Sequence, residues 1–334
     1  MTGAGALVRL LADPRRAGDM RDWTSLIAIA RAESLIGTLA RRLSGMAVPE
    51  RVRELLAQAA REAEYARCRA LWEVEMAKRA LAPLGLPVVL LKGSAYAAAG
   101  LSAGQGRSIG DLDILVPRGG LDAVQAALLA SGWEWVKQDP YDDEYYRRWM
   151  HELPPLIHRE RDRMIDVHHT ILPLTARRKP DAAAMIENSL DLAKGMRVLS
   201  PADMVIHWAA HLFADGDLAG GLRNLWDIDR LLRDFASADP GFWQELEARA
   251  ALHDLSAAVQ RAARLASDLY DTPVPESWRV GGRADSLFMA RLLARNGWGQ
   301  PTRPGLRLAF YVRSHWMRMP PAMLARHLWT KARR

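Results

Sequence analysis

The sequence predicts an α+β fold in which a small mixed β-sheet lies between two helical regions. Apolar residues recur at helical spacing over residues 22–81, short β-branched apolar runs follow, and helical spacing returns from residue 200 onwards. We therefore expect four regions: N-terminal helices over 1–84, a mixed α/β core over 85–175, a helical domain over 176–285 and a basic, aromatic helical tail over 286–334.

The N-terminal region is expected to contain two or three helices. Residues 22–44 place apolar side chains at helical spacing, and Pro49 opens a second pattern that runs to about Leu81. Two prolines and a glycine over residues 83–87 then end the helical region. The second pattern should therefore lead directly into the core.

The core is expected to consist of short apolar strands and one helix. The helix covers residues 121–130 and is ended by Gly132. The strands are bounded by glycine, proline and charged residues. They are residues 87–91, 111–116, 133–137, 155–160 and 163–169, of which the last two form a hairpin.

Composition excludes several classes of protein. The 334 residues are enough to bury a sizeable core. No run of 18 apolar residues and no secretory signal is present, so we expect a cytoplasmic protein without a transmembrane segment. The single cysteine, Cys68, excludes an intramolecular disulfide and a multi-cysteine zinc site.

Positive charge is concentrated at the C-terminal end. Residues 286–334 contain ten Lys or Arg side chains and no Asp or Glu, so the net charge of +7 leaves 7 − 10 = −3 for the first 285 residues. Aromatic residues are interspersed among these cations. The tail therefore either contacts RNA or an anionic membrane surface, or packs as an Arg-rich cap on the acidic remainder.

Two aspartates open an apolar run in the segment R-S-I-G-D-L-D-I-L-V (107–116). In a strand, Asp111 and Asp113 project to the same face, with their Cα atoms about 6.6 Å apart. Two carboxylates so placed can hold a pair of Mg²⁺ ions that clamp the attacking and leaving oxygens of a phosphoryl transfer. Hard carboxylate ligands favour Mg²⁺, with Mn²⁺ able to substitute.

A glycine-serine turn lies upstream of these aspartates, at the end of the first expected strand. Gly93 allows close backbone approach, and Ser94 can cap an Ala-rich helix whose free N–H groups and positive dipole end suit a triphosphate. Lys92 and Arg107 flank the turn and are placed to neutralise phosphate charge. We therefore expect this segment to bind a nucleotide.

A third carboxylate is needed to complete the metal shell and to accept the proton of the attacking hydroxyl. Asp166 is the best candidate because it lies in the apolar run M-I-D-V-H-H, where an acid otherwise has no reason to be buried. His168 shares its strand face and is expected to contact the triphosphate or to orient a carboxylate. A D-x-D pair alone is more often two solvated acids, and the whole combination is far more specific.

Together these motifs resemble a known family. The sequence resembles the uncharacterised nucleotidyltransferase family of the polymerase-β superfamily. The resemblance rests on the segments L-K-G-S and R-x-x-G-D-L-D-I-L-V, on the strand with Asp166 and His168, and on the helical segments P-A-D-M-V-I-H-W-A-A-H and R-N-L-W-D-I-D. This family is related to abortive-infection-type toxin nucleotidyltransferases. The likeness covers roughly residues 20–235.

The resemblance implies Mg²⁺-dependent transfer of a nucleoside monophosphate from a nucleoside triphosphate to a hydroxyl group. It implies nucleotide and metal binding by Gly93, Ser94, Asp111 and Asp113. It implies the same for Asp166, although the family often has glutamate there. The acceptor stays open between RNA, a protein side chain, a peptide and a small molecule.

Two rival functions use the same motif. A sugar-nucleotide glycosyltransferase also holds a metal and a diphosphate with D-x-D, but it predicts a long αβα domain ahead of the motif, where this sequence has helical patterns. A catalytically silent module would bind the nucleotide without releasing pyrophosphate.

His207 and His211 lie four residues apart on an expected helix and face the same way. A zinc site there requires Asp215 as the third ligand. A polar cluster with Arg223, Asp227 or Asp229 of the next expected helix is favoured instead. That cluster either braces the two helices or lines the acceptor side of the cleft.

Overall fold

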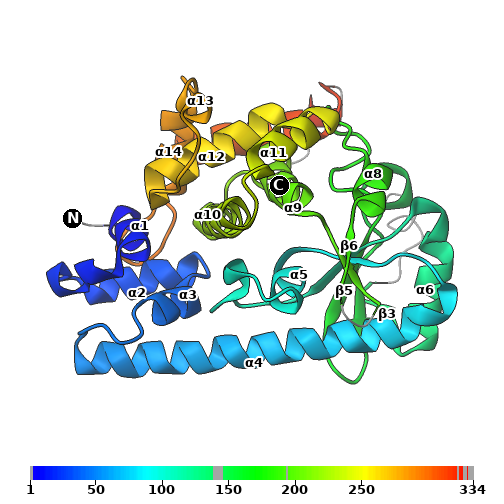
Figure 1. Cartoon of the computed structure of the whole chain (residues 1–334), viewed down its shortest axis with the longest axis horizontal. Coiled ribbons are helices and arrows are strands. Elements are labelled where there is room, and N and C mark those ends of the chain that lie inside the picture. Colours follow the sequence, from blue (N-terminus) through cyan, green and yellow to red (C-terminus); the bar gives the residue numbers. More distant parts are fainter. Residues whose placement is uncertain (1–2, 138–145, 193–194, 322, 326–328, 330–334) are drawn as a thin grey trace.

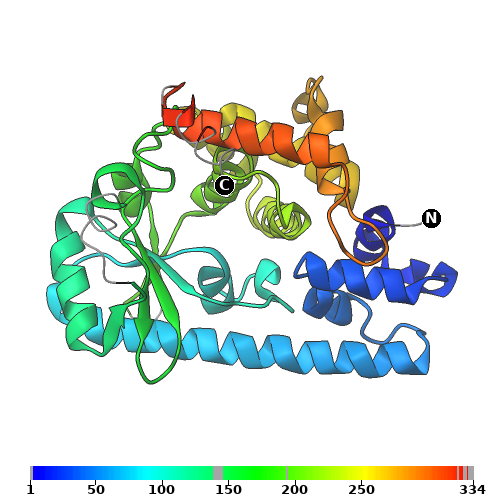
Figure 2. The ribbon, with the colours of Figure 1, turned by 180° about the vertical axis from the view of Figure 1, so that it is seen from behind.

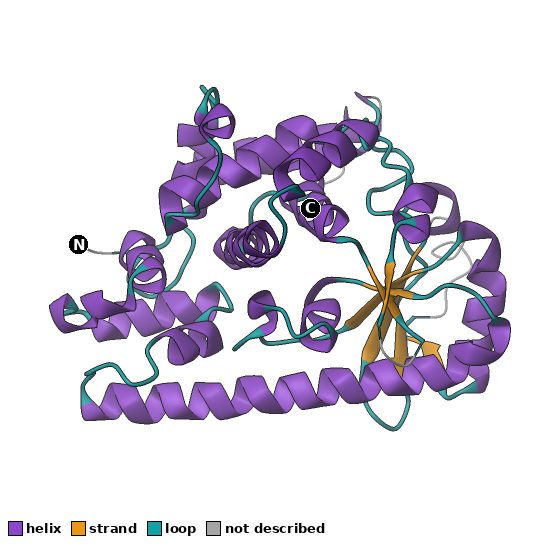
Figure 3. Cartoon of the chain, in the orientation of Figure 1, coloured by secondary structure: helices purple, strands orange, loops and turns teal. Residues whose placement is uncertain are grey.

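The computed structural model combines a mixed sheet at one end with a helical body at the other, and one long helix runs beneath both (Figure 1). It describes residues 3–137, 146–192, 195–321, 323–325 and 329. Figure 3 shows that the strands gather on one side while helices form most of the chain. This confirms the α+β class with helical flanks on either side of the sheet in sequence.

The N-terminal region is helical, as predicted. Its α-helices in the described residues are α1 (Ala4–Ala12), α2 (Trp23–Ala32), α3 (Ile36–Arg42) and α4 (Glu50–Leu81). Helix α4 begins directly after Pro49 and has 32 residues, which corresponds to a length of about 48 Å. It contacts α3 near its start and strand β2 near its end, so it joins the helical body to the sheet.

The sheet has seven strands in the order β3-β4-β5-β2-β1-β7-β6. β2 pairs in parallel with β5, and β1 pairs in parallel with β7, whereas the remaining pairs are antiparallel. The strands are β1 (Val89–Leu90), β2 (Leu112–Leu115), β3 (Trp133–Trp135), β4 (Leu156–His158), β5 (Met164–His168), β6 (Leu190–Asp191) and β7 (Arg197–Val198).

The predicted hairpin is confirmed, because β4 and β5 are antiparallel neighbours with Leu156 opposite Ile165. The predicted helix over 121–130 is α6 (Leu121–Ala130). The sequence did not predict β6 and β7, because two-residue strands show no periodicity. They extend the sheet beyond residue 175, where the core was expected to end.

The C-terminal part of the chain is again helical. The helical spacing that the sequence shows from residue 200 onwards gives no break near Asp254, but in the structure the chain there has a left-handed φ of 56°, which cannot continue a helix. The helices that follow β5 are α8 (Ala182–Glu187), α9 (Pro201–Ala210), α10 (Gly221–Ala238), α11 (Phe242–Leu252), α12 (Ser256–Tyr270), α13 (Glu276–Arg279), α14 (Asp285–Leu292) and α15 (Pro304–Arg318).

The described part of the basic tail packs on the rest of the chain. Figure 2 shows α15 running across the back of the helical body. Arg295 forms a 2.7 Å ion pair with the buried Glu33, and Arg313 donates a 2.7 Å hydrogen bond to the carbonyl of Phe213. These contacts favour a tail that packs on the rest of the chain as an Arg-rich cap over a tail that binds RNA or an anionic membrane surface. Among the described residues, no helix is both long and apolar enough to cross a membrane.

A close backbone approach positions the glycine-rich loop that leads to the aspartates. A Cβ atom on Gly37 of α3 would lie 2.5 Å from the carbonyl oxygen of Gly106, so no larger residue fits without movement. Gly106 also has a φ of 66°. The N-terminal helices therefore support the segment between the Gly-Ser turn and β2.

Candidate active site

Asp113 and Asp166 lie side by side at the centre of the sheet. They are directly opposite each other in the parallel pair β2–β5, so their Cα atoms are about 4.8 Å apart and their side chains leave the same face. Asp113 is buried and Asp166 is half-buried. The register of the sheet is therefore consistent with the prediction that Asp113 and Asp166 belong to one metal site.

Asp111 lies at the edge of this pair. The expected strand begins at Leu112 and not at Asp111, which occupies a bend before β2 and is exposed. Its charge nevertheless contributes to the electrostatic environment of Asp166. Asp111 therefore stands at the solvent side of the acidic cluster.

Lys92 and His168 both contact the carboxylate of Asp113. Lys92 Nζ lies 2.6 Å from Asp113 Oδ1, and His168 Nε2 lies 3.1 Å from the same oxygen. Burial alone would raise the pKa of Asp113, but the charge of Lys92 and the hydrogen bond to His168 lower it below its usual value. Asp113 is therefore held as a carboxylate.

Asp166 has the opposite environment. Burial and the neighbouring carboxylates of Asp113, Glu152 and Asp111 raise the pKa of Asp166 to about 7. Burial acts to lower the pKa of Lys92, but the carboxylates of Asp113, Asp166 and Glu152 raise it above its usual value. Without a further cation, the cluster therefore holds more carboxylates than one lysine can compensate.

The Gly-Ser turn directly follows β1 and opens α5 (Lys92–Ala98). Lys92 itself has a φ of 51°, a left-handed conformation unusual for a lysine. The Ser94 hydroxyl is buried and has no hydrogen-bond partner among the described residues. A buried hydroxyl of this kind is available to a ligand.

Arg107 packs on Gly93, where a Cβ atom would lie 2.7 Å from the Arg107 Nε atom. Its guanidinium forms a 3.0 Å ion pair with Asp227 of α10 and lies over the ring of Trp208. Arg107 thus lies next to the Gly-Ser turn, as predicted, but its guanidinium pairs with the buried Asp227. Its predicted contact with phosphate stays a prediction.

Arg223 and Asp227 are fully buried and paired with each other. Arg223 Nη2 lies 2.6 Å from Asp227 Oδ1, and Asp227 is shared with Arg107. Both residues lie on α10 and are buried, which gives no support to an acceptor-side role, and the charges that act most on His207 are those of Lys92 and His211 and not those of this pair.

His207 lies on α9, close to the acidic cluster. Burial, and then the charges of Lys92 and His211, lower the pKa of His207 well below its usual value. His211 follows one turn later in the segment His211–Asp215. The side chain of Asp215 lies outside the described residues, so the zinc alternative gains no support here.

The sequence analysis missed His151 and Glu152. The Glu152 carboxylate lies 3.4 Å from His168 Nδ1, and the imidazole of His151 stacks on that of His168. The only sequence signal was an His-Glu pair at the end of an irregular aromatic stretch, whereas the pairing with β5 requires the fold.

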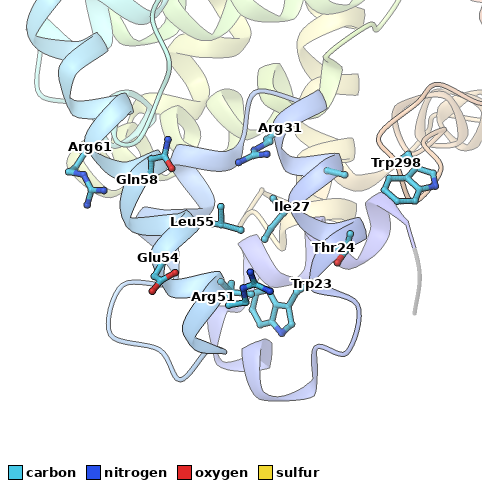
Figure 4. A pocket seen from close by; sticks show the side chains of 12 residues that line it. Trp23, Thr24, Ile27, Arg31, Arg51, Glu54, Leu55, Gln58, Arg61 and Trp298 are labelled. Atoms are coloured by element: carbon cyan, nitrogen blue, oxygen red, sulfur yellow. The ribbon is translucent and has the colours of Figure 1, made fainter.

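A cavity of about 800 Å³ lies elsewhere, between α2 and the first turns of α4 (Figure 4). It is lined by Trp23, Leu55 and Trp298, and by arginines such as Arg31. No residue of the acidic cluster lines it. We therefore locate the candidate active site at the sheet and not in this cavity.

Acids on adjacent parallel strands, beside a Gly-Ser turn that follows the neighbouring strand, are the arrangement typical of polymerase-β-type nucleotidyltransferases. The family model described as uncharacterised nucleotidyltransferase matches residues 19–271, and the chain belongs to this family. A comparison with curated proteins finds no match. The family assignment makes the protein a transferase in general terms and leaves its substrates open.

Proposed function

We propose that this protein transfers a nucleoside monophosphate from a nucleoside triphosphate to a hydroxyl group and releases pyrophosphate. One observation carries the proposal: Asp113 and Asp166 lie opposite each other on β2 and β5, and the turn after the neighbouring strand β1 holds the buried Ser94 hydroxyl, which has no hydrogen-bond partner among the described residues. The family match over residues 19–271 supports the reaction class.

The acidic cluster fits a divalent cation. Asp113 is held ionised, whereas burial, and then the neighbouring carboxylates, raise the pKa of Asp166. Asp111, Asp113 and Asp166 would hold Mg²⁺, which supplies charge neutralisation and phosphate orientation in such sites, and Mn²⁺ offers similar chemistry. The carboxylates thus serve both as ligands and as a frame for the triphosphate.

The remaining residues have roles that follow from their positions. Ser94 would donate its hydroxyl to the β or γ phosphate, and Gly93, whose missing side chain makes room for Arg107, would offer its backbone to the same phosphates. Lys92 Nζ already lies at the carboxylates and would contact a phosphate oxygen bound there. His168 holds Asp113 in place through Nε2.

Asp166 is also the proposed proton acceptor. The pKa of about 7 belongs to the metal-free cluster, and a bound cation would lower it, so this role rests on the position of Asp166 opposite Asp113 and on the proton-accepting chemistry of a carboxylate. The acceptor hydroxyl would approach on the Asp166 side of the pair, where the side chain is only half-buried. Hydroxyls of RNA, a protein side chain, a peptide or a small molecule all satisfy this chemistry.

Incubation with triphosphates labelled at the α or the γ phosphate tests the reaction class. We expect the α label to appear in an acceptor from a cell extract and the γ label to appear in pyrophosphate, and EDTA should prevent both. Transfer of the γ label, or release of γ label only as orthophosphate, would contradict nucleotidyl transfer. Transfer of sugar from a UDP-sugar would favour the glycosyltransferase instead.

A further inference from the structure

A second group of metal-ligand side chains lies beside Asp113. His151, Glu152 and His168 each offer one ligand atom, and these atoms lie within 4.8 Å of one another. Glu152 Oε2 is 3.4 Å from His168 Nδ1 and 3.7 Å from His151 Nε2. Two ring nitrogens therefore converge on one carboxylate oxygen.

The separations suit coordination to one ion. Ligand atoms about 2.0–2.2 Å from a tetrahedral ion are about 3.4 Å apart from each other. The two nitrogen–oxygen distances at Glu152 are close to this value. Two imidazoles and one carboxylate, with further positions open, form a common donor set for zinc and other transition metals.

The contact between His168 and Asp113 supplies an independent argument. Because the Asp113 carboxylate accepts a hydrogen bond, Nε2 of a neutral His168 carries the hydrogen and the lone pair on Nδ1 faces Glu152. Two acceptors 3.4 Å apart repel each other unless a cation or a proton lies between them. A carboxylate behind a histidine is also the usual outer partner of a metal-bound imidazole.

Backbone pairing holds the three side chains in place. Glu152 and His168 form an antiparallel bridge next to β5. The amide of Leu153 donates a 2.9 Å hydrogen bond to the carbonyl of Val167, and the amide of His169 donates one of 2.9 Å to the carbonyl of His151. The ligands therefore stand on paired extended segments, which position a site more accurately than a loop does.

We propose that His151, Glu152 and His168 form a second metal site, which binds a divalent first-row transition metal ion in preference to Mg²⁺. Mg²⁺ requires oxygen ligands, whereas imidazole nitrogen suits Zn²⁺ and other first-row ions such as Fe²⁺ and Ni²⁺. The site differs from the carboxylate set that includes Asp111. It goes beyond the proposed transfer and does not depend on it, because metal binding is measured without a nucleotide.

Titration of the untagged protein with Co²⁺ tests this site, by calorimetry and by the visible absorption of the bound ion. We expect one equivalent of Co²⁺ to bind in the presence of excess Mg²⁺. The substitutions Glu152→Gln and His151→Gln should each weaken this binding at least about 100-fold, because loss of a ligand costs more than loss of an outer partner. Circular dichroism establishes that each variant is folded.

Two further variants separate this site from the carboxylate set. Asp111→Asn and the control Glu134→Gln, an exposed glutamate on β3, should bind Co²⁺ as the wild type does. Absence of Co²⁺ binding in the wild type would overturn the proposal, since a proton on His168 would then bridge Asp113 and Glu152. Loss of binding in Asp111→Asn, with retention in a folded Glu152→Gln or His151→Gln, would overturn it as well.

Discussion

Replacement of Asp111 by asparagine is expected to lower nucleotidyl transfer at least about 1,000-fold, which corresponds to about 4 kcal/mol of transition-state stabilisation. The amide removes one anionic metal ligand at the solvent side of the cluster while it preserves the shape of the side chain. Asp111 is exposed, so the free energy of unfolding should change by less than about 0.5 kcal/mol. Initial rates with saturating Mg²⁺ and thermal denaturation measure the two quantities.

The matched control for this variant is Asp122→Asn on α6. Asp122 is an exposed acid that pairs with Arg147 at the protein surface. It should retain full transfer. If Asp111→Asn also retained transfer within about threefold, Asp111 would have no place in the metal shell and the proposed mechanism would fail.

The substitution Asp166→Asn is expected to move activity and stability in opposite directions. Transfer should fall at least about 100-fold, because the variant loses both a metal ligand and the proton acceptor. The metal-free protein should become more stable by roughly 1–4 kcal/mol at pH 8, because the amide removes a carboxylate whose ionised form is disfavoured there. A merely structural acid would not show this combination.

The pH dependence of this stability follows from the sign of the pKa shift. The pKa of Asp166 is about 7 in the folded protein against 3.8 as the ordinary value, so the contribution of Asp166 to the stability of the metal-free wild type falls as pH rises from about 4 to 7. The Asp166→Asn variant lacks this loss. The difference in free energy of unfolding between the variant and the wild type should therefore be small at pH 4 and reach its full value above pH 7. Urea denaturation in EDTA across this range measures it.

Asp162→Asn serves as the control for Asp166→Asn, because Asp162 is exposed in the turn of the same hairpin. Its left-handed φ of 52° is one that asparagine also adopts readily. This control should show no change in either activity or pH dependence. If the gain in free energy of unfolding of Asp166→Asn over the wild type did not grow with pH, the proposed repulsion between Asp166 and its neighbouring carboxylates would be refuted.

The parts of the site that the sequence predicted rest on short-range geometry. The spacing of Asp111 and Asp113, and the burial of Asp166 in an apolar run, require only the period of a strand. The hairpin with β4 and β5 follows from the charged turn around Asp162 between two apolar runs. The hairpin is confirmed and Asp166 lies opposite Asp113, whereas Asp111 lies in a bend before β2 and not in the strand.

The remaining features depend on contacts between distant segments. The sequence suggests Arg107 as a phosphate ligand, but in the fold Arg107 forms an ion pair with Asp227, which lies 120 residues later. Glu152 joins the site only because its segment pairs with β5 at His168. No periodicity within either segment reports such a pairing.

The central claim is that Asp111, Asp113 and Asp166 coordinate the same divalent cations close to Ser94. Anomalous scattering from crystals grown with Mn²⁺ and a non-hydrolysable triphosphate measures this directly. We expect Mn²⁺ peaks about 2.2 Å from oxygens of Asp111, Asp113 and Asp166, with the phosphates next to the Ser94 hydroxyl. A triphosphate bound away from the Gly-Ser turn, or carboxylates that contact no Mn²⁺ while the nucleotide is in place, would contradict it.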